Sequence, residues 1–249
     1  LYEFGREVNK IRPFFPLLAR TERPRGRVAF VNPWAEWVMN PQEHRLPPGH
    51  EGYGYYRRYA VPFDRYYPSA RRGLLAYELF HRSFSDLEQV DEQLLCERDI
   101  DYGAVVVSDC EFLMRRTAER LMDFVDDGGV LILDQLPTRD ETGATLEVFE
   151  RMTEAASDDS AIIEPNLRYS MFEVGKGRII VFSRNLQDAY ADAVESGREG
   201  RRERMETAVT SLLEDAGLRA RWASSNSDID VAWRAAEGAV LIPVSNTSP

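Results

Sequence analysis

The sequence predicts an α/β fold, with an open parallel sheet covered by helices on both faces. The prediction rests on three observations within residues 104–140. The run Ala104–Val107 is short, apolar and β-branched, which is typical of a strand that is covered on both faces. A stretch of helical periodicity follows, and two glycines then lead into a second apolar run, Val130–Leu133. Strand, helix and strand in this order form one unit of an open parallel sheet.

The helix between these strands is amphipathic, because apolar and charged positions recur at helical spacing on opposite faces. The apolar set is Met114, Ala118, Leu121, Met122 and Val125, and the charged set is Arg115, Arg116, Glu119, Arg120 and Asp123. We expect Asp109 to be the N-cap, or to lie near it, for a helix that begins around Glu111. Gly128 and Gly129 should end the helix, with one of them at positive φ.

The residues after the second strand are candidates for function, because ligands of parallel sheets gather at the carboxyl ends of strands. Asp134, Gln135, Leu136 and Pro137 stand there. This stretch resembles the class I glutamine amidotransferase-like superfamily, in which helix, glycine turn and strand lead into a sharp elbow that carries a nucleophilic Cys. On that resemblance Asp134 takes the Cys position, with Gln135 beside it in a degenerate elbow. A carboxylate cannot form the thioester that amide hydrolysis requires, so the resemblance implies the fold and argues against the activity.

Within that superfamily the chain resembles the domain that follows the catalytic barrel in family 42 β-galactosidases, usually called the trimerisation domain. Four pieces carry the resemblance: a strand in residues 27–34 (RVAFVNPW), a helix in 74–84, the unit 101–133, and a strand in 176–183 (KGRIIVFS). Residues 87–94 fill the place of a further strand segment. The resemblance implies a flavodoxin-like fold, a homo-oligomer, and acid and base catalysts in a barrel that precedes this domain.

The two ends of the chain differ in pattern from its centre. Residues 1–26 contain a helix-like stretch, which we interpret as a connection from an upstream domain. Helices are expected at 185–196 and 205–216, the second ending at Gly217. Apolar or alternating runs at 218–224, 229–235 and 239–244 predict strands, with Glu237 and Gly238 as a hairpin turn. The predicted domains are therefore 1–26, 27–217 with an insert at 34–68, and 218–249 as the start of a small β module.

The composition argues against three classes of protein, namely nucleic-acid-binding, membrane-spanning and disulfide-rich proteins. The chain has 249 residues, of which 43% are hydrophobic, enough for one sizeable core. A net charge of −11 makes nucleic acid a poor partner, because a phosphate backbone binds basic surfaces. No apolar run reaches the length of about 20 residues that a membrane span needs. The two cysteines are too few for a disulfide scaffold and favour a reducing, cytoplasmic location.

Cys110 directly follows a predicted strand and could be a nucleophile. It would need a His base, yet the three histidines, His44, His50 and His81, do not follow a later strand as the base of an amidotransferase does. Its neighbours Asp109 and Glu111 would raise the pKa of the thiol. We therefore favour a structural role for Cys110 over a catalytic one.

The carboxylates of Asp134, Asp140 and Glu141 could belong to a metal or glycosidase site. Glycosidases need two acids at a set separation in a sugar-shaped cleft, and no His-rich or Cys-rich spacing supports a transition metal. The alternative is that Thr138, Asp140 and Thr142 cap a loop and a helix at 145–156. We predict no catalytic residue, no metal and no cofactor in this chain.

Residues 52–68 (GYGYYRRYAVPFDRYYP) combine aromatic and arginine side chains. The candidate binding or interface residues are Tyr53, Tyr55, Tyr56, Arg57, Arg58, Tyr59, Phe63, Arg65, Tyr66 and Tyr67. Tyr and Arg are enriched in interface hot spots, and aromatic rings also stack on sugars. The segment could instead pack locally on its own domain. We favour an interface or the rim of a neighbouring active site.

These observations together predict a non-catalytic domain of a larger glycoside hydrolase, with an upstream catalytic domain and other subunits as partners and carbohydrate as a possible ligand. Two alternatives remain open. One is a hydrolase that stands alone and uses Cys110 or the Asp134 elbow. The other is an amidotransferase-like protein that stands alone and binds a small molecule.

Overall fold

A computed structural model gives the structure of the chain. It describes residues 27–39, 68–84, 86–149, 160–164, 167–195 and 200–219, together with four short strands between residues 229 and 246. The candidate aromatic residues from Tyr53 to Tyr67 and the expected N-terminal helix lie outside the described residues.

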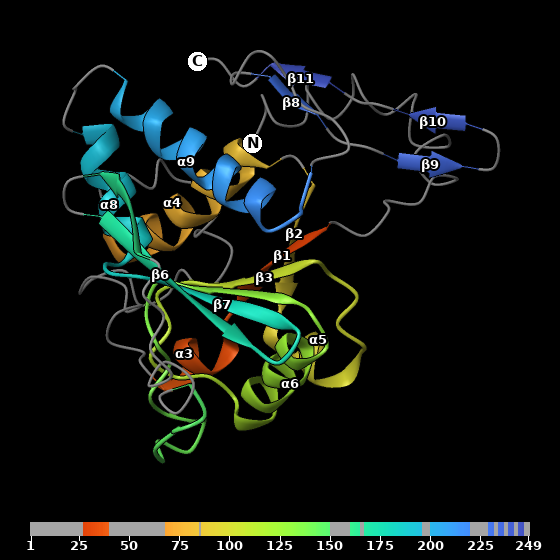
Figure 1. The fold of residues 1–249 in the computed structure, drawn as a ribbon, viewed down its shortest axis with the longest axis vertical. Helices are drawn as coiled ribbons and strands as arrows, with labels where there is room; N and C mark the ends of the chain where they lie inside the picture. Colours follow the sequence, from red (N-terminus) through yellow and green to blue (C-terminus); the bar gives the residue numbers. More distant parts are fainter. Residues whose placement is uncertain are drawn as a thin grey trace, which may run out of the picture.

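The centre of the molecule is a seven-stranded sheet in the order β2-β1-β3-β4-β7-β6-β5 (Figure 1). The strands are β1 (Val28–Asn32), β2 (Leu87–Asp91), β3 (Ala104–Val107), β4 (Val130–Leu133), β5 (Ser160–Glu164), β6 (Leu167–Val174) and β7 (Gly177–Phe182). The first five in spatial order are parallel, and β6 and β5 continue the sheet in antiparallel fashion.

The parallel part confirms the predicted fold class. Its order, β2-β1-β3-β4-β7, is the 2-1-3-4-5 order of flavodoxin-like sheets. The antiparallel pair β5 and β6 was not predicted. It comes between β4 and β7 in sequence but lies beyond β7 in space, so it extends the sheet without interrupting the parallel order.

Helices cover both faces of the sheet (Figure 1). On one face lie α4 (Pro68–Ser83), α8 (Leu186–Glu195) and α9 (Arg201–Asp215); on the other lie α3 (Trp34–Met39), α5 (Glu92–Glu97) and α6 (Arg115–Asp126). Successive strand residues alternate between the two cores. In β1, Val28 and Phe30 join the core under α4, α8 and α9, whereas Ala29 and Val31 join the core under α5 and α6. This alternation explains why β3 and β4 are apolar throughout and why β1 is apolar up to Asn32.

The start of α6 corrects one prediction. The helix begins at Arg115, not near Glu111, and Asp109 is not its N-cap. Asp109 instead adopts a φ of 52°, a left-handed conformation that is uncommon outside glycine. Its side chain contributes to the candidate site described below.

The predicted helix stop is confirmed. Gly128 has a φ of 112°. Its N–H donates to Val125 O, and the N–H of Gly129 donates to Phe124 O, which is the hydrogen-bond pair of a Schellman motif. The turn packs tightly against β7: a Cβ at Gly177 would lie 2.2 Å from Gly129 O and 2.4 Å from Val125 O.

The C-terminal elements agree in part with the expectations. Gly217 follows α9 with a φ of 81°, as expected for a helix stop. The single strand expected at 229–235 is in fact two strands, β8 (Ile229–Val231) and β9 (Arg234–Ala236). The single strand expected at 239–244 is likewise two strands, β10 (Ala239–Leu241) and β11 (Val244–Asn246). β9 pairs antiparallel with β10, in keeping with a turn at 237–238, and β8 pairs with β11. Leu218 and Arg219 are not in a strand, and residues 220–224 lie outside the described part.

The helix expected at 145–156 does not form where the structure describes it. Thr145 makes an antiparallel bridge with Arg139, and Val148 and Phe149 form a turn. The remaining residues of that prediction are not among the described ones. Within the described residues, no helix is both long enough and apolar enough to span a membrane.

Candidate functional site at the carboxyl ends of the strands

The carboxyl ends of the parallel strands carry acidic and amide side chains. Asn32 ends β1, Glu92 follows β2, Ser108 and Asp109 follow β3, Asp134 follows β4, and Asn185 precedes α8 after β7. This edge is where an open parallel sheet places its ligands.

Asp134 joins three elements. Its Oδ2 accepts hydrogen bonds from Ser108 Oγ at 2.6 Å and from Leu186 N at 2.9 Å, and its Oδ1 accepts one from Asp109 N at 2.8 Å. The residue is only 5% exposed. Burial raises the pKa of Asp134 to about 6, although the three donors oppose part of that rise. Directly after β4 the chain thus has a buried hydrogen-bond acceptor.

Asp109 and Asn185 form a second link beside it. Asn185 Nδ2 donates to Asp109 Oδ1 at 2.6 Å. Asn185 Oδ1 accepts from Gln187 N at 2.9 Å, so Asn185 also caps α8. The left-handed conformation of Asp109 places its backbone N–H on Asp134 while its side chain meets Asn185.

Two further buried acids hold the neighbouring loops. Glu92, which is fully buried, accepts from Ala35 N at 2.8 Å and from Met114 N at 2.5 Å. Glu36 Oε2 accepts from Glu111 N at 2.8 Å and from Phe112 N at 2.9 Å. Burial raises the pKa of Glu92, and its backbone donors oppose the rise. Glu92 thus satisfies the N–H of Met114, the N-cap of α6, whereas Glu36 satisfies two N–H groups in the loop before the helix.

Cys110 lies among these acids and is completely buried. Its Sγ donates to Phe112 O at 3.0 Å. Burial raises the pKa of Cys110 well above its usual range, and the carboxylates of Glu36, Glu92 and Asp134 add to the rise. A thiol in this environment is protonated at neutral pH and is a poor nucleophile.

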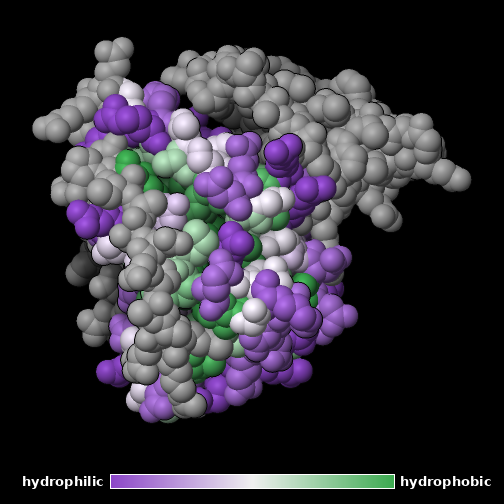
Figure 2. Space-filling model, viewed as in Figure 1, coloured by the Kyte–Doolittle hydropathy of each residue, from purple (hydrophilic) through white to green (hydrophobic). Residues whose placement is uncertain are grey.

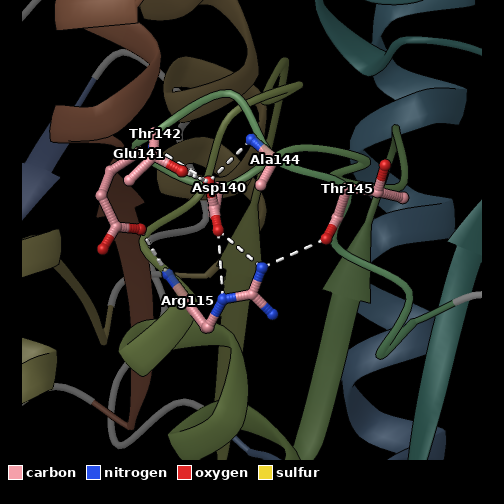
Figure 3. Close-up of polar contacts among 6 residues, drawn as sticks. All are labelled: Arg115, Asp140, Glu141, Thr142, Ala144 and Thr145. Atoms are coloured by element: carbon pink, nitrogen blue, oxygen red, sulfur yellow. Dashed lines mark hydrogen bonds and ion pairs between the residues drawn. The ribbon is translucent and has the colours of Figure 1, made fainter.

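A separate acidic centre organises the loop after β4 (Figure 3). Asp140 Oδ1 accepts from Thr142 N at 2.9 Å, Thr142 Oγ1 at 2.7 Å and Ala144 N at 3.0 Å. Its Oδ2 accepts from Arg115 Nη2 at 2.6 Å, and the same nitrogen donates to Thr145 O at 3.2 Å. Glu141 Oε2 accepts from Arg115 N at 2.8 Å. The hydrogen bond from Thr142, followed by that from Arg115, lowers the pKa of Asp140 well below its usual range.

The acids that the sequence singled out therefore fall into two groups. Asp134 lies with Ser108 and Asp109 at the sheet edge, whereas Asp140 and Glu141 bind Arg115 at the start of α6. Gln135 is exposed. No group of three or more His, Cys, Asp or Glu side chains suited to a metal ion occurs among the described residues. His81 lies in α4, 5.6 Å from the Tyr77 ring.

Sequence reasoning missed Glu36, Glu92 and Asn185. Asn185 carried a usable signal, because an Asn directly before a helical pattern is a common N-cap. Nothing in the local sequence around Glu36 and Glu92 indicated their role, because the N–H groups that they bind lie far away in sequence.

The surface on the side drawn in Figure 2 is mainly hydrophilic, with a band of hydrophobic side chains beside the grey residues. Three large apolar side chains of the described part are prominently exposed, namely Trp34, Val38 and Val194. Trp34 and Val38 are one helical turn apart in α3 and so lie on the same side of that helix.

The fold and this edge define a flavodoxin-like α/β domain. At the carboxyl ends of its strands, buried carboxylates accept hydrogen bonds from neighbouring backbone and side-chain groups. The sequence matches no protein-family model and no curated protein. Among solved structures, Gan42B, a GH42 β-galactosidase from G. stearothermophilus, is similar with a TM-score of 0.61 and 14% identity, over 99% of this chain and 38% of that chain.

Two further β-galactosidases give the same picture. The enzyme from Rahnella sp. R3 has a TM-score of 0.57 and 15% identity over 98% of this chain and 39% of that chain. The enzyme from Bacillus circulans sp. alkalophilus has a TM-score of 0.58 and 12% identity over 96% of this chain and 38% of that chain. The chain thus spans less than half the length of these proteins, and at these identities the likeness establishes a shared fold.

Proposed function

We propose that this chain is a non-catalytic α/β domain of a larger glycoside hydrolase, where it holds subunits together and helps to shape a carbohydrate site. The observation that carries the proposal is the match of nearly the whole chain to a part of GH42 β-galactosidases. A region that corresponds to 38% of a longer enzyme is expected to work together with the rest of it. The resemblance of the residues around Asp134 to the class I glutamine amidotransferase-like superfamily belongs to the same proposal.

The chemistry of the strand ends supports a non-catalytic role. A nucleophilic site needs a nucleophile, a base and an orienting group within hydrogen-bond reach. Here Asp134 is engaged by three donors, and the Cys110 thiol is buried with a raised pKa. In the described residues, the polar groups at this edge bind one another and the backbone.

The test is an activity assay on the isolated chain and on the full-length gene product. We expect the isolated chain to lack glutaminase, esterase and glycosidase activity, and the full-length product to hydrolyse a nitrophenyl galactoside. Turnover of glutamine or a nitrophenyl ester by the isolated chain, lost in Cys110→Ala, would favour the hydrolase alternative and contradict the proposal.

Assembly is tested separately by light scattering. We expect the full-length product to be an oligomer with residues of this chain at the subunit contacts. A full-length product that is active as a monomer would contradict the assembly part of the proposal and leave the glycoside hydrolase part standing.

A further inference from the structure

The carboxyl ends of the strands are where an open α/β sheet usually binds its ligand, in the crevice beside the point at which the strand order reverses. In this sheet that point lies between β1 and β3. Phosphate-bearing ligands are held at such a place by backbone N–H groups of loops and helix starts. The partners of those N–H groups therefore decide which class of ligand this edge can take.

Side-chain carboxylates already occupy backbone N–H groups at this edge. Seven donors, from the segments after β1, β3 and β7 and from the start of α6, each bind a carboxylate: they are Ala35, Asp109, Glu111, Phe112, Met114, Arg115 and Leu186. The acceptors are Glu36, Glu92, Asp134 and Glu141. These carboxylates stand where the oxygens of a bound phosphate would stand, and their negative charge repels a further anion. The edge is therefore unsuited to a phosphate or a nucleotide.

Trp34 is what this edge offers to a ligand instead. It is the first residue of α3, two positions after the end of β1, and it is 44% exposed. The start of α3 is held in place, because Glu92 accepts from Ala35 N and Glu36 accepts from two N–H groups of the loop after β3. An exposed indole on a fixed backbone is a flat apolar surface that loses little conformational entropy when a ligand covers it.

Two polar side chains lie beside Trp34. Asn32 Nδ2 donates to Asp91 Oδ1 at 3.0 Å, and the two residues are paired at the ends of β1 and β2. Among the described residues, no partner is found for Asn32 Oδ1 or for Asp91 Oδ2. Only Pro33 separates Asn32 from Trp34, so their Cα atoms are at most about 7 Å apart. Acceptors for hydroxyl groups and an exposed aromatic ring thus share one small area.

We propose that Trp34, Asn32 and Asp91 form a subsite for the ring of an uncharged sugar. The indole packs against the C–H groups of the ring, and Asn32 and Asp91 bind its hydroxyl groups. A neutral ligand is favoured because anions are excluded at this edge and because amide and carboxylate oxygens suit hydroxyl donors. The choice of a sugar rests on the proposed function, in which this chain helps to shape a carbohydrate site.

Nuclear magnetic resonance of the ¹⁵N-labelled chain measures binding at this position. The chain has four tryptophans, and the indole N–H signal of Trp34 is the one that Trp34→Phe removes. Titration with lactose should move this signal to a saturating position. A Trp34 signal that stays in place throughout the titration overturns the proposal.

Variants test whether the aromatic ring carries the binding, with affinity read from the saturation-transfer signals of lactose itself. Trp34→Ala should weaken binding about tenfold because the stacking surface is lost, and Trp34→Phe should weaken it less because an aromatic face remains. Asn32→Ala should weaken it through the lost hydrogen bonds. Val38→Ala is the matched control, since Val38 is an exposed apolar residue on the same side of α3, and it should leave the affinity unchanged. Equal losses in Trp34→Ala and Val38→Ala contradict a stacking subsite.

Two charged probes test the class of ligand. Galactose 1-phosphate carries the same ring as galactose with added negative charge, so it should bind more weakly than galactose. Choline tests whether the indole is a cation–π site. Tighter binding of galactose 1-phosphate than of galactose, or binding of choline in place of galactose, overturns the proposal. So does a face that binds no sugar but loses self-association, by light scattering, in both Trp34→Ala and Val38→Ala.

The subsite and the proposed function can fail separately. A full-length product that hydrolyses no galactoside, while this chain binds lactose through Trp34, contradicts the proposed function and supports the subsite. A full-length product that hydrolyses a galactoside, while lactose leaves the Trp34 signal of this chain in place, overturns the subsite and leaves the proposed function standing.

Discussion

At the scale of single residues, the acids of this protein serve as hydrogen-bond acceptors for the backbone. Glu36, Glu92 and Asp134 are each buried and each receive at least two donors. A buried carboxylate is costly unless it is hydrogen-bonded, and a buried N–H left without a partner costs about 1–3 kcal/mol. The strand ends are therefore ordered by side chains that in other proteins of this class of fold could serve chemistry.

The cysteines give a prediction at this scale. Cys96 and Cys110 are both buried, and the pKa of Cys110 is raised. Because only an accessible thiolate reacts readily with iodoacetamide, both should be alkylated slowly in the native protein and rapidly in denaturant at the same pH. Mass spectrometry of the labelled peptides measures each site. Rapid native labelling of Cys110 would show that the thiol is accessible and would reopen its catalytic interpretation.

Asp140 gives a second prediction, with a definite dependence on pH. Its pKa is lowered in the folded protein, so its contribution to stability is present above the ordinary pKa of 3.8 and is lost as the pH falls below that value. Asp140→Asn should thus lower the free energy of unfolding at pH 7 and make a smaller difference at pH 2. Urea unfolding at the two pH values measures this, and an equal effect at both would contradict the assignment.

Arg115→Ala serves as the partner variant for Asp140, because Arg115 donates to Asp140 and to Thr145 O. Arg116→Ala, one position further along α6, is the control. The first variant should be less stable than the second at pH 7. The two deletions at Arg115 and Asp140 should also be less than additive, since they remove the same interaction.

At the scale of secondary-structure elements, the end of α6 is held by glycines for two different reasons. Gly128 needs its positive φ, whereas Gly177 is needed because its backbone passes directly against the turn. A Cβ at Gly217, the other helix stop, would meet nothing within 4 Å. Substitutions at Gly217 and Gly177 therefore distinguish two costs. At Gly217 only the strain of a positive φ is introduced, whereas at Gly177 a new Cβ overlaps backbone atoms.

Gly128→Val should lower the free energy of unfolding by about 1 kcal/mol or more, because a β-branched residue is strained at a φ of 112°. The denaturation midpoint measures the loss. An unchanged midpoint would mean that the turn relaxes to another conformation at no cost.

Gly177→Ala and Gly217→Ala extend this comparison. Gly217→Ala should cost about 1–2 kcal/mol through its left-handed backbone alone. Gly177→Ala should cost at least as much as an overpacked core, about 1–3 kcal/mol, because the overlapping atoms belong to the backbone and cannot rotate away. A Gly177→Ala variant as stable as the parent would contradict the close approach of β7.

Elements whose pattern is local were predictable from the sequence. The strands β3 and β4 are fully apolar, and the glycine pair marks the end of α6, so short windows sufficed. The predicted start of α6 was wrong because Asp109 has the residue type and position that are common for an N-cap. In the structure, two carboxylates that are distant in sequence, Glu92 and Glu141, accept from the N–H groups of Met114 and Arg115 instead. The pair β5 and β6 was not predicted, because the side chains of β6 are mostly half-buried and its sequence lacks a clear alternation of apolar and polar residues.

At the scale of the whole molecule, the sheet order could be anticipated only through the family resemblance, because strand order depends on contacts between distant segments. The flavodoxin-like order is confirmed, whereas the antiparallel extension was unforeseen. The candidate site was half predictable: the position of Asp134 followed from its place after β4, but its partners required the structure.

The aromatic segment gives a prediction at this scale, which rests on the sequence alone because the segment lies outside the described residues. Changing Tyr55, Tyr56 and Tyr59 together to Ser should weaken self-association, because a surface rich in tyrosine and arginine is typical of interface hot spots. Light scattering measures the mass before and after the change, with circular dichroism to show that the fold persists. If the mass and the kinetics of the full-length enzyme are both unchanged, the segment packs only within its own domain.

The place of β7 in the sheet has a consequence for how the chain folds. β4 pairs with β3 on one side and with β7 on the other, yet residues 134–176 separate it from β7 in sequence. Before β7 is available to the folding chain, β2, β1, β3 and β4 can already pair with one another. The chain must then leave one edge of an entirely apolar strand without a neighbour. Such an edge pairs readily with other chains, so the chain is exposed to aggregation until β7 pairs with β4.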